Sequence, residues 1–435
     1  MTTIIYWFRN DLRLADNPAF NAACEAATVL VPMYCHDITG DAETAWGFPR
    51  IGDHRRAWLA ATLADLRDQL EARGSGLIEL DGTPSTVLLA LARQVGAQAV
   101  YCEEIAAPEE RGMVAGLAAA GLKVVTQWQS SMLEPRELPF AVERLPDVFT
   151  AFRNAVEKAG ALPPQPVSMP SSLPPLPPSL PAVSSAGTAV GQLDSTSAAA
   201  THDPRSSFPY WEAEFTGGET TALAHLQRYF GKGLAQTYKL TRNGLAGTDY
   251  SSKFSPWLAT GALSPRVAYA MLKDCEEEQG ANDSTYWLWF ELMWREYFRF
   301  LHLKYGKKLY RGRGLHDGPA PTHNIQGFDR WRQGRTGEPF TDAGMRELAA
   351  TGYLSNRMRQ NVASYLVHDL RGDWRAGAAW FESQLIDYDV YSNQGNWLYV
   401  AGRGTDPRGS RRFDPGKQAR DYDPDGQYRR LWNEA

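Results

Sequence analysis

The side chains best suited to do chemistry lie close together in the sequence, between residues 351 and 399. This stretch carries arginines, carboxylates and amides, namely Asn356, Arg357, Arg359, Gln360, Asp387, Asp389 and Asn393. Such groups are costly to bury unless they are paired or hold a ligand, yet apolar runs such as VASYLV and WFESQLI frame them. Three tryptophans, Trp374, Trp380 and Trp397, are interleaved with them. Polar groups within an aromatic core indicate a buried polar ligand that contains a flat ring.

Spacing predicts how these side chains act together. Asn356 and Arg359 are three residues apart on a predicted helix and therefore share a face. Asp387 is a natural ion-pair partner for Arg359. Asp387, Asp389 and Asn393 would then present two acceptors and one amide to a ligand. Asn393 can donate and accept hydrogen bonds but cannot readily give up a proton, a property that would matter beside a redox-active ring nitrogen.

A second candidate segment is DYSSKFSP, residues 249–256. Its serines and single lysine, Ser251, Ser252, Lys253 and Ser255, come just before a helix-like run that begins near Pro256. Backbone N–H groups at a helix start, together with hydroxyls and a lysine, make a cradle for a diphosphate. The alternative is a helix-capping loop in which the serines are incidental.

A predicted helix over residues 286–305 carries the third group, Glu291, Trp294 and Arg295. Glu291 and Arg295 are four residues apart and share a face, which large apolar side chains flank. This face either holds an intrahelical salt bridge in the core or lines a pocket in which Trp294 stacks on a planar ligand.

Tryptophan is abundant in the second half of the chain. The protein has 14 tryptophans, and ten of them lie from Trp211 onward. Trp374, Trp380 and Trp397 either pack a helical core or form a path along which an electron hops between rings. The sequence alone leaves both interpretations open.

Length and charge bound the class of protein. At 435 residues the chain is too long for one compact core, so two domains are expected. Residues 1–150 hold 12 basic against 20 acidic side chains, and residues 217–435 hold 30 against 25. A mildly basic second half is compatible with a phosphate-backbone partner and also with an ordinary solvated surface.

Several classes of protein are excluded by what the sequence lacks. The four cysteines show no CxxC or metal-type spacing, which indicates reduced thiols in a cytoplasmic protein and no metal site. The opening segment becomes charged at Arg9, so it is not a signal peptide, and no run of about 18 apolar residues could span a membrane. Metalloprotease, P-loop and nucleophile-elbow motifs are missing, which argues against hydrolytic chemistry.

Short apolar runs alternate with helical patterns in the first third of the chain. The pattern predicts strands at residues 4–8, 28–34, 76–80, 97–102 and 123–126, and helices at residues 55–73, 85–95 and 109–120. Strands that alternate with helices indicate a parallel sheet covered on both faces. Residues 1–130 are therefore predicted to form a doubly wound α/β domain.

The rest of the chain divides into a linker and a helical domain. Residues 131–216 are predicted to be a linker because residues 163–181 contain nine prolines and residues 182–200 are rich in Ser, Ala, Thr and Gly. Helical patterns follow at residues 220–230, 286–305, 341–348, 357–370 and 374–385. No strand is expected after residue 126, so residues 217–435 are predicted to be all-α.

These pieces, in this order, resemble the photolyase/cryptochrome family, and in particular its cryptochrome DASH branch. The similar segments include WFRNDLRLADNPAF, TRNGLAGTDYSSKFSPWLATGALSPR, STYWLWFELMWREYFRF and DWRAGAAWFESQLIDYDVYSNQGNW. The resemblance covers nearly the whole chain except the linker at residues 160–216. It implies a Rossmann-like first domain that can carry an antenna, and a helical domain that binds FAD bent into a U.

The resemblance implies roles for most of the candidate residues. The phosphate region of FAD would be held by Tyr238, Ser251, Ser252, Lys253, Phe254 and Ser255. The flavin would be surrounded by Arg295, Asn356, Arg359, Asp387, Asp389 and Asn393, with Asn393 facing N5. The catalytic pocket for the damaged pyrimidine pair would be formed by Glu291, Trp294, Asn356, Gln360 and Tyr399. Arg357 and Arg411 would lie near the DNA backbone.

Two positions favour the DASH branch. Gln360 stands where ordinary cyclobutane photolyases carry Met, and Tyr399 stands where they carry a second pocket Trp. A Tyr offers less stacking energy for extruding a dimer from a duplex, so single-stranded or looped DNA would be the preferred partner.

The implied activity is the light-driven repair of cyclobutane pyrimidine dimers by a deoxyribodipyrimidine photolyase-type lyase. Excited FADH⁻ would donate an electron to the dimer, the ring would split and the electron would return, while Glu291 stabilises the dimer anion by a hydrogen bond. One alternative is a blue-light photoreceptor whose flavin alters a partner. Another is a nucleic-acid binding protein with a structural flavin. A monomer is expected.

The electron relay departs from the family pattern. Trp397 and Trp374 match the inner two of three relay tryptophans, but no Trp lies between Trp294 and Trp331 to be the outermost. The resemblance then implies slow photoreduction of the flavin or a relay that ends on a tyrosine such as Tyr305 or Tyr310.

The antenna is a further expectation. Members of the DASH branch often hold a folate, methenyltetrahydrofolate, between the two domains. Glu104 in the segment YCEEIAAPEER is the candidate contact. The alternative is a surface glutamate without this role.

Overall fold

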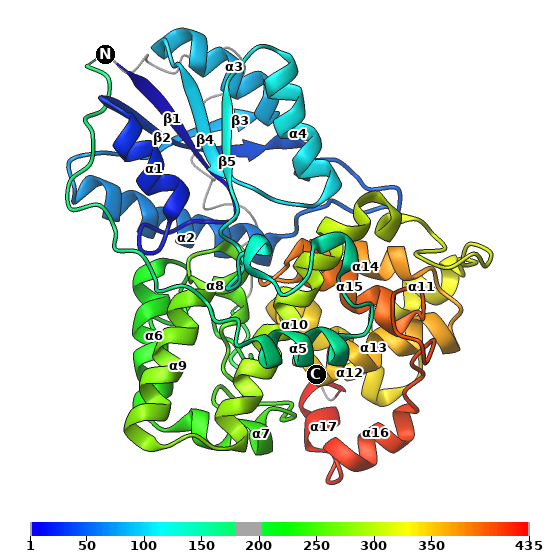
Figure 1. The fold of residues 1–435 in the computed structure, drawn as a ribbon. Coiled ribbons are helices and arrows are strands. Elements are labelled where there is room, and N and C mark those ends of the chain that lie inside the picture. The colour runs from blue at the N-terminus through cyan, green and yellow to red at the C-terminus, as the bar shows by residue number, and fades with distance from the viewer. Residues whose placement is uncertain (1, 179–201, 434–435) are drawn as a thin grey trace.

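The computed structural model describes residues 2–178 and 202–433, and Figure 1 shows a β-sheet domain joined to a helical body. The sheet consists of β1 (Thr3–Phe8), β2 (Val29–Asp37), β3 (Ile78–Gly82), β4 (Ala99–Glu103) and β5 (Val124–Gln127). All pairings are parallel, and the strand order is β3-β2-β1-β4-β5. This order runs outward from β1 in both directions, so the predicted doubly wound sheet is confirmed.

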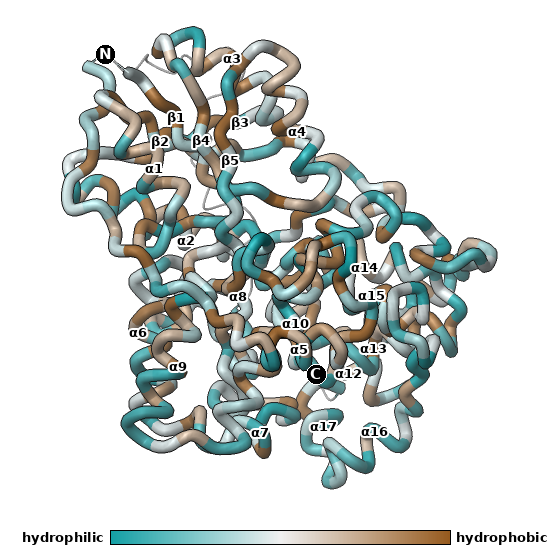
Figure 2. Tube along the Cα trace, viewed as in Figure 1, coloured by the Kyte–Doolittle hydropathy of each residue, from teal (hydrophilic) through white to brown (hydrophobic). Residues whose placement is uncertain are grey.

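Four helices cover the two faces of the sheet. Helices α1 (Pro18–Ala26) and α2 (Asp53–Glu71) pack on one face, and α3 (Pro84–Val95) and α4 (Pro108–Ala119) pack on the other. Since successive strand residues face opposite sides, Ile4 and Tyr6 belong to the first core, and Ile5 and Trp7 belong to the second. The central strand β1 is accordingly apolar along most of its length, and Figure 2 shows brown tube inside the domain. Helix α1, capped by Asn17, was not predicted.

The second domain is helical. Its helices are α6 (Glu219–Gly231), α7 (Tyr238–Thr241), α8 (Ser255–Thr260), α9 (Pro265–Gln279), α10 (Asp283–Tyr305), α11 (Ile325–Arg332), α12 (Pro339–Thr351), α13 (Asn356–Ser364), α14 (Trp374–Gln384), α15 (Val390–Val400), α16 (Pro415–Tyr422) and α17 (Gln427–Asn433). Within the described ranges no strand follows β5, so the all-α prediction is confirmed. The predicted helix at residues 357–370 is shorter than expected, because α13 ends at Ser364 and a π-helical turn continues over Tyr365–Asp369.

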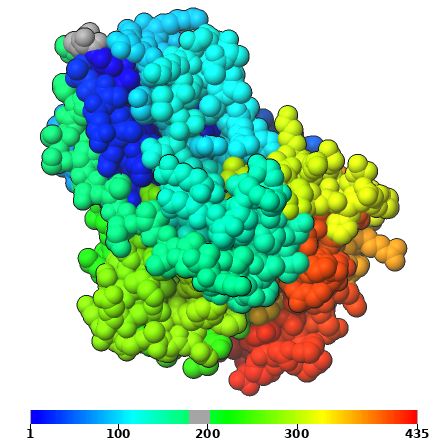
Figure 3. Space-filling model, viewed as in Figure 1, coloured from blue at the N-terminus to red at the C-terminus, as the bar shows by residue number. Residues whose placement is uncertain are grey.

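Part of the predicted linker is a structural element. Helix α5 (Phe149–Ala159) buries Phe149, Phe152 and Val156 against α10, so the prediction of a linker over residues 131–216 was wrong for this part. These three side chains recur at helical spacing, a pattern that the neighbouring proline-rich stretch obscured. In Figure 3 the segment that follows the sheet spreads across the front of the helical domain. The Ser- and Ala-rich stretch at residues 182–200 lies outside the described residues.

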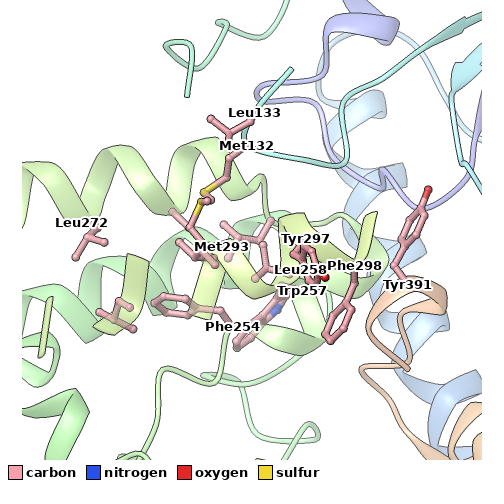
Figure 4. Close-up of a cluster of buried hydrophobic side chains, with 14 of the residues drawn as sticks. Met132, Leu133, Phe254, Trp257, Leu258, Leu272, Met293, Tyr297, Phe298 and Tyr391 are labelled. Carbon is pink, nitrogen blue, oxygen red and sulfur yellow. The ribbon is translucent and has the colours of Figure 1, made fainter. Parts of the chain in front are cut away.

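The loop after β1 joins the two domains. The carboxylate of Asp16 pairs with the buried guanidinium of Arg266 on α9 at 2.8 Å, and the N–H of Leu12 donates to the carbonyl of Thr260. Gly261 has a φ of +72°, and a Cβ there would lie 1.9 Å from the carbonyl oxygen of Asn10, so only glycine allows this approach. Below the junction, side chains from α8, α9 and α10 and from residues 132–133 form one apolar cluster, shown in Figure 4. This cluster fixes the elements that carry the site.

Candidate functional site

The helical domain encloses two adjoining hollows of about 390 and 250 Å³, which we together call the central hollow. Its walls come from α7, α8, α10, α13 and α15. It brings together nearly all of the predicted ligand and catalytic residues: Tyr238, Ser251, Ser252, Lys253, Phe254, Ser255, Glu291, Trp294, Arg295, Asn356, Arg359, Gln360, Asp387, Asp389, Asn393, Trp397 and Tyr399. Trp374, Arg357, Arg411 and Glu104 do not line it. Residues 238–399 thus converge on one cavity of the size that small-molecule sites have.

Arg359 and Asp387 form the expected ion pair at the wall of the central hollow. Nη2 of Arg359 lies 2.8 Å from Oδ2 of Asp387, and Nε donates to the carbonyl of Leu354. Burial alone would lower the pKa of Arg359, but the facing carboxylate raises it above its usual value. The second carboxylate oxygen of Asp387, Oδ1, is buried and has no hydrogen-bond partner within the described part of the chain. A ligand that fills the hollow can therefore donate a hydrogen bond to Asp387.

Asp389 is less available to a ligand than predicted. It caps α15 by accepting from the N–H of Ser392, and its Oδ2 lies 2.7 Å from Nη2 of Arg299. Burial would raise the pKa of Asp389, but Arg299 and Arg295 hold it below the usual range. Both oxygens of Asp389 already have protein partners, and a contact between Asp389 and a ligand stays a prediction.

Asn393 extends from the first turn of α15 into the central hollow. Its Nδ2 donates to the carbonyl of Ala378 on α14 at 3.0 Å, which fixes the rotation of the amide. The same helix carries Trp397 and Tyr399 on the wall of the hollow. One short helix thus supplies an oriented amide and two aromatic rings.

The segment over residues 250–254 forms a further part of the wall of the central hollow. Ser251, Ser252 and Ser255 line the cavity, but the side chain of Lys253 is 2% exposed and points onto the ring of Tyr250, with Nζ 3.4 Å from the ring centroid. The helix that follows is only six residues long. Hydroxyl groups and a buried ammonium, rather than the end of the helix, are therefore what this region offers to an anion.

Glu291 has a partner that spacing did not predict. Its Oε1 lies 2.6 Å from Nη2 of Arg242, which follows α7 and also lines the central hollow. Burial raises the pKa of Glu291, and Arg242 opposes this shift. Arg295 does not pair with Glu291, because its guanidinium donates to the carbonyls of Ser130 and Leu258. The intrahelical salt bridge, one of the two interpretations from the sequence, is therefore not formed.

Two aromatic side chains stand at one mouth of the central hollow. The ring of Trp294 stacks on Phe149 of α5, with centroids 3.7 Å apart and planes inclined by 11°. Tyr399 approaches Trp294 edge-on at 6.2 Å, and the guanidinium of Arg411 lies 5.1 Å from the Tyr399 ring. Helix α5 was not predicted, so the support that it gives to Trp294 was missed as well.

Gln360 and Arg357 form a connected pair on α13. Nη1 of Arg357 donates to Oε1 of Gln360 at 3.0 Å, and Nη2 donates to Asn243. The same guanidinium lies 4.3 Å from the ring of Tyr422. Gln360 lines the central hollow, and Arg357, which does not line it, holds the Gln360 side chain through this hydrogen bond. A contact between Arg357 and a DNA backbone stays a prediction, as does one with Arg411.

The three tryptophans of the predicted electron path have different surroundings. Trp397 lines the central hollow, and Trp374 lies buried on α14 with its Nε1 donating to the carbonyl of Gly312. A Cβ at Gly377 would lie 2.1 Å from the ring of Trp397, so glycine lets α14 and α15 approach here. Trp380 does not line the central hollow and packs on Phe48, with ring centroids 4.9 Å apart. This contact favours core packing for Trp380.

A further hollow, which we call the interdomain hollow, lies between the two domains and has a volume of about 390 Å³. It is lined from the first domain by Trp46, Arg50, Glu109 and Glu110 and from the second by residues that include Trp374 and Asn393. Glu104 is not among them and instead pairs with Arg111 at 3.3 Å. The role of Glu104 as an antenna contact stays a prediction, and the glutamates that line this hollow, Glu109 and Glu110, are five and six residues further along.

Metal-binding groups and membrane-spanning helices are both absent from the residues that the structure describes. Residues 2–178 and 202–433 contain no group of His, Cys, Asp and Glu that could hold a metal ion. No helix within the same ranges is long and apolar enough to cross a membrane.

Comparison with known proteins decides the family. A cryptochrome DASH from Xenopus laevis is 46% identical over 438 residues, which cover 99% of this chain and 82% of that protein. A cryptochrome DASH from Synechocystis is 43% identical over 437 residues, covering 99% of this chain and 87% of that protein. The chain belongs to the cryptochrome DASH family.

Domain models and solved structures agree with the cryptochrome DASH assignment. Residues 4–171 match the model described as DNA photolyase, and residues 287–434 match the FAD binding domain of DNA photolyase. The crystal structure of a Synechocystis cryptochrome superposes with a TM-score of 0.90 at 41% identity, covering 99% of this chain and 88% of that one. A class III photolyase from Agrobacterium tumefaciens superposes with a TM-score of 0.81 at 29% identity, covering 99% and 86% of the two chains. This cryptochrome DASH is thus a photolyase-like flavoprotein.

The residues of the central hollow fit FAD. Nζ of Lys253 and Oδ1 of Asp387 are buried and have no hydrogen-bond partner among the residues that the structure describes. A ligand that carries an anion and a hydrogen-bond donor would satisfy both atoms. A flavin dinucleotide carries a diphosphate and a polar flat ring, which match these two atoms and the rings of Trp397 and Phe381.

Proposed function

We propose that this cryptochrome DASH repairs cyclobutane pyrimidine dimers in light, with a preference for single-stranded DNA. The observation that carries the proposal is that Glu291, Gln360 and Tyr399 line the same cavity as the Arg359–Asp387 pair. A cofactor held by the pair and a base contacted by the other three would share one space.

FAD would be held at two places. Ser251, Ser252, Ser255 and Lys253 would hold the phosphates, and Arg359, Asp387 and Asn393 would orient the ring. When bound in its reduced form, the flavin supplies an electron on absorbing light. The Arg359–Asp387 pair presents a fixed charge pattern at one wall of the hollow.

Glu291 would donate a hydrogen bond to the damaged base pair. Burial raises the pKa of this carboxyl, so it keeps a proton at a higher pH than an exposed glutamate does. Arg242 holds the side chain in place from the opposite side. Stabilising charge where it develops on the pyrimidines is the contribution that such a donor makes to the reaction.

The preference for single strands follows from the mouth of the hollow. Trp294 already has one face covered by Phe149, and Tyr399 offers a smaller ring than a tryptophan. Less stacking energy is then available to extrude a dimer from a duplex, whereas bases in single strands and loops are already unstacked.

The interdomain hollow is the proposed place for a folate antenna. Arg50 bridges Glu109 and Glu382 across the domains at 2.6 Å each, and Oε2 of Glu110 is buried without a partner within residues 2–178 and 202–433. Asn393 lines both hollows, so a pigment bound here would lie beside the ring site.

One assay tests the repair proposal. The reduced, FAD-loaded protein is illuminated with single-stranded and double-stranded oligonucleotides that contain a thymine dimer, and parallel samples stay in the dark. Restored thymine absorbance in light, faster on single strands, is the expected result. Binding of the oligonucleotide without restoration in light would support the alternative of a light-sensing or structural flavoprotein. Repair by Glu291→Ala at the wild-type rate would reject the role of Glu291.

A further inference from the structure

One buried amine at the wall of the central hollow, that of Lys253, has no hydrogen-bond partner within the described residues. Lys253 is 2% exposed, and its Nζ makes no hydrogen bond to any residue in the described ranges, yet the residue lines the cavity. Its backbone has a φ of +59°, a conformation that non-glycine residues seldom adopt. The loop thus holds a lysine inside the protein at a conformational cost, which points to a role for the amine.

Two aromatic rings surround the amine. Nζ lies 3.4 Å from the ring centroid of Tyr250 and 4.9 Å from that of Tyr353. The faces of aromatic rings attract a cation but do not neutralise it. A protonated Lys253 would therefore carry an uncompensated charge in the empty cavity, which favours the neutral amine there until an anion arrives.

The charged groups that face Lys253 come from several elements. Glu347 on α12 and Asp387 before α15 attract a cation, as does Asp249 on the same loop, whereas Arg359 on α13 repels it. His225 on α6 donates a hydrogen bond from Nε2 to the carbonyl of Ser252, and burial lowers its pKa to about 4, so it is neutral.

Glu347 is the second buried group in this region that can take up a proton. It is fully buried and accepts hydrogen bonds from Tyr428 and from Ser207, the latter at 3.1 Å. Burial raises its pKa to about 7, although Tyr428, Ser207 and Lys253 oppose this shift. Burial likewise lowers the pKa of Lys253 well below its usual value. In the empty cavity these two shifts favour a neutral amine on Lys253 and a protonated, neutral carboxyl on Glu347.

We propose that the entry of a ligand diphosphate into the central hollow is coupled to the uptake of one proton, which Lys253 receives. This inference rests on the proposed function, since FAD is the diphosphate ligand. The step is an acid–base reaction: a buffer acid or hydronium gives a proton to the lone pair of Nζ, and an N–H bond forms. The new ammonium offsets one of the negative charges that the ligand brings into the cavity.

Calorimetric titration of the flavin-free protein with FAD tests the proposal. Runs at one pH near neutrality in PIPES and in Tris, which differ in ionisation enthalpy, report the number of protons taken up. The expected result is an uptake that approaches one proton per FAD, together with an affinity that falls by up to about tenfold for each unit of rising pH. Riboflavin, which has no phosphate, should bind without this uptake.

Two variants show which residue takes up the proton, Lys253 or Glu347. Lys253→Met should bind FAD more weakly and without uptake, whereas Glu347→Gln should keep the uptake. Uptake that persists in Lys253→Met and vanishes in Glu347→Gln would assign the proton to Glu347 and overturn the proposal. If Lys253→Met does not fold, Glu347→Gln decides alone: uptake that is retained in this variant supports Lys253, and uptake that is lost assigns the proton to Glu347.

The failures of the two proposals are distinguishable. FAD that binds wild type with the same apparent enthalpy in both buffers contradicts the proton uptake and leaves the proposed function standing. A protein that does not bind FAD at all contradicts both.

Discussion

The indole of Trp294 on α10 lies flat against the ring of Phe149 on α5, at a centroid distance of 3.7 Å. The two residues are 145 positions apart, and only the return of the chain from the sheet domain brings them together. The proposed base-stacking residue is therefore held by the segment between the domains.

Replacing Phe149 by Ala should loosen Trp294. We expect the free energy of unfolding to fall by about 3 kcal/mol, because a buried phenyl ring is lost. The affinity for a single strand with a thymine dimer should fall about tenfold, which corresponds to the free energy that an aromatic pair contributes. Denaturant titration and fluorescence binding measure the two effects. Phe152→Ala, on the same helix but without a stacking contact to Trp294, is the control and should lose stability alone.

The Arg359–Asp387 pair should be required for flavin retention. Asp387→Asn leaves a partly buried guanidinium without a carboxylate, so we expect a loss of about 1–2 kcal/mol in stability and a purified protein with little flavin. The flavin absorbance per protein measures retention. Asp329→Asn, which breaks an exposed pair with Arg332, should change neither quantity appreciably. Full flavin content in Asp387→Asn would contradict the role of the pair.

Glu291 predicts a pH dependence of repair. The folded-state pKa of this carboxyl is raised, so the proton that it donates is present at low pH and is lost as the pH rises through the raised pKa. Single-turnover repair should therefore decline on the alkaline side. Glu291→Gln keeps an N–H donor at every pH and should remove this decline. Identical pH profiles of wild type and Glu291→Gln would show that another group sets the decline.

Trp374 and Trp380 should differ in electron transfer. Photoreduction of oxidised FAD in the presence of a thiol reductant should slow at least severalfold in Trp374→Phe, because Trp374 is the proposed second member of the relay. Trp380→Phe should keep the wild-type rate, since Trp380 packs on Phe48. The rate of loss of the oxidised flavin band under blue light provides the measurement, and equal rates in both variants would remove Trp374 from the relay.

Local patterns were enough to predict the sheet. Strand β1 is an unbroken apolar run, and the other strands are short apolar runs bounded by helices, so period and length identified all five. Helix α9 was missed because its second half, DCEEEQ, is almost entirely polar, although Ala268 and Leu272 bury its other face. Helix α5 was missed because prolines dominate the residues that follow it.

The site was predictable where partners follow from charge and resemblance, as for Arg359 and Asp387. It was not predictable where tertiary contacts choose among partners. Glu291 sits four residues before Arg295, yet it pairs with Arg242, which is 49 positions away. No spacing rule signals that contact, because it depends on how α7 packs beside α10. Asp389 likewise pairs with Arg299, a residue for which the sequence analysis predicted no role.

The central claim is that the central hollow binds a flavin dinucleotide, and titration of the flavin-free protein with FAD tests it most directly. We predict saturation at one FAD per chain, a yellow protein after gel filtration, and at least a tenfold weaker affinity in Asp387→Asn. A wild-type protein that stays colourless after reconstitution with FAD would contradict the account.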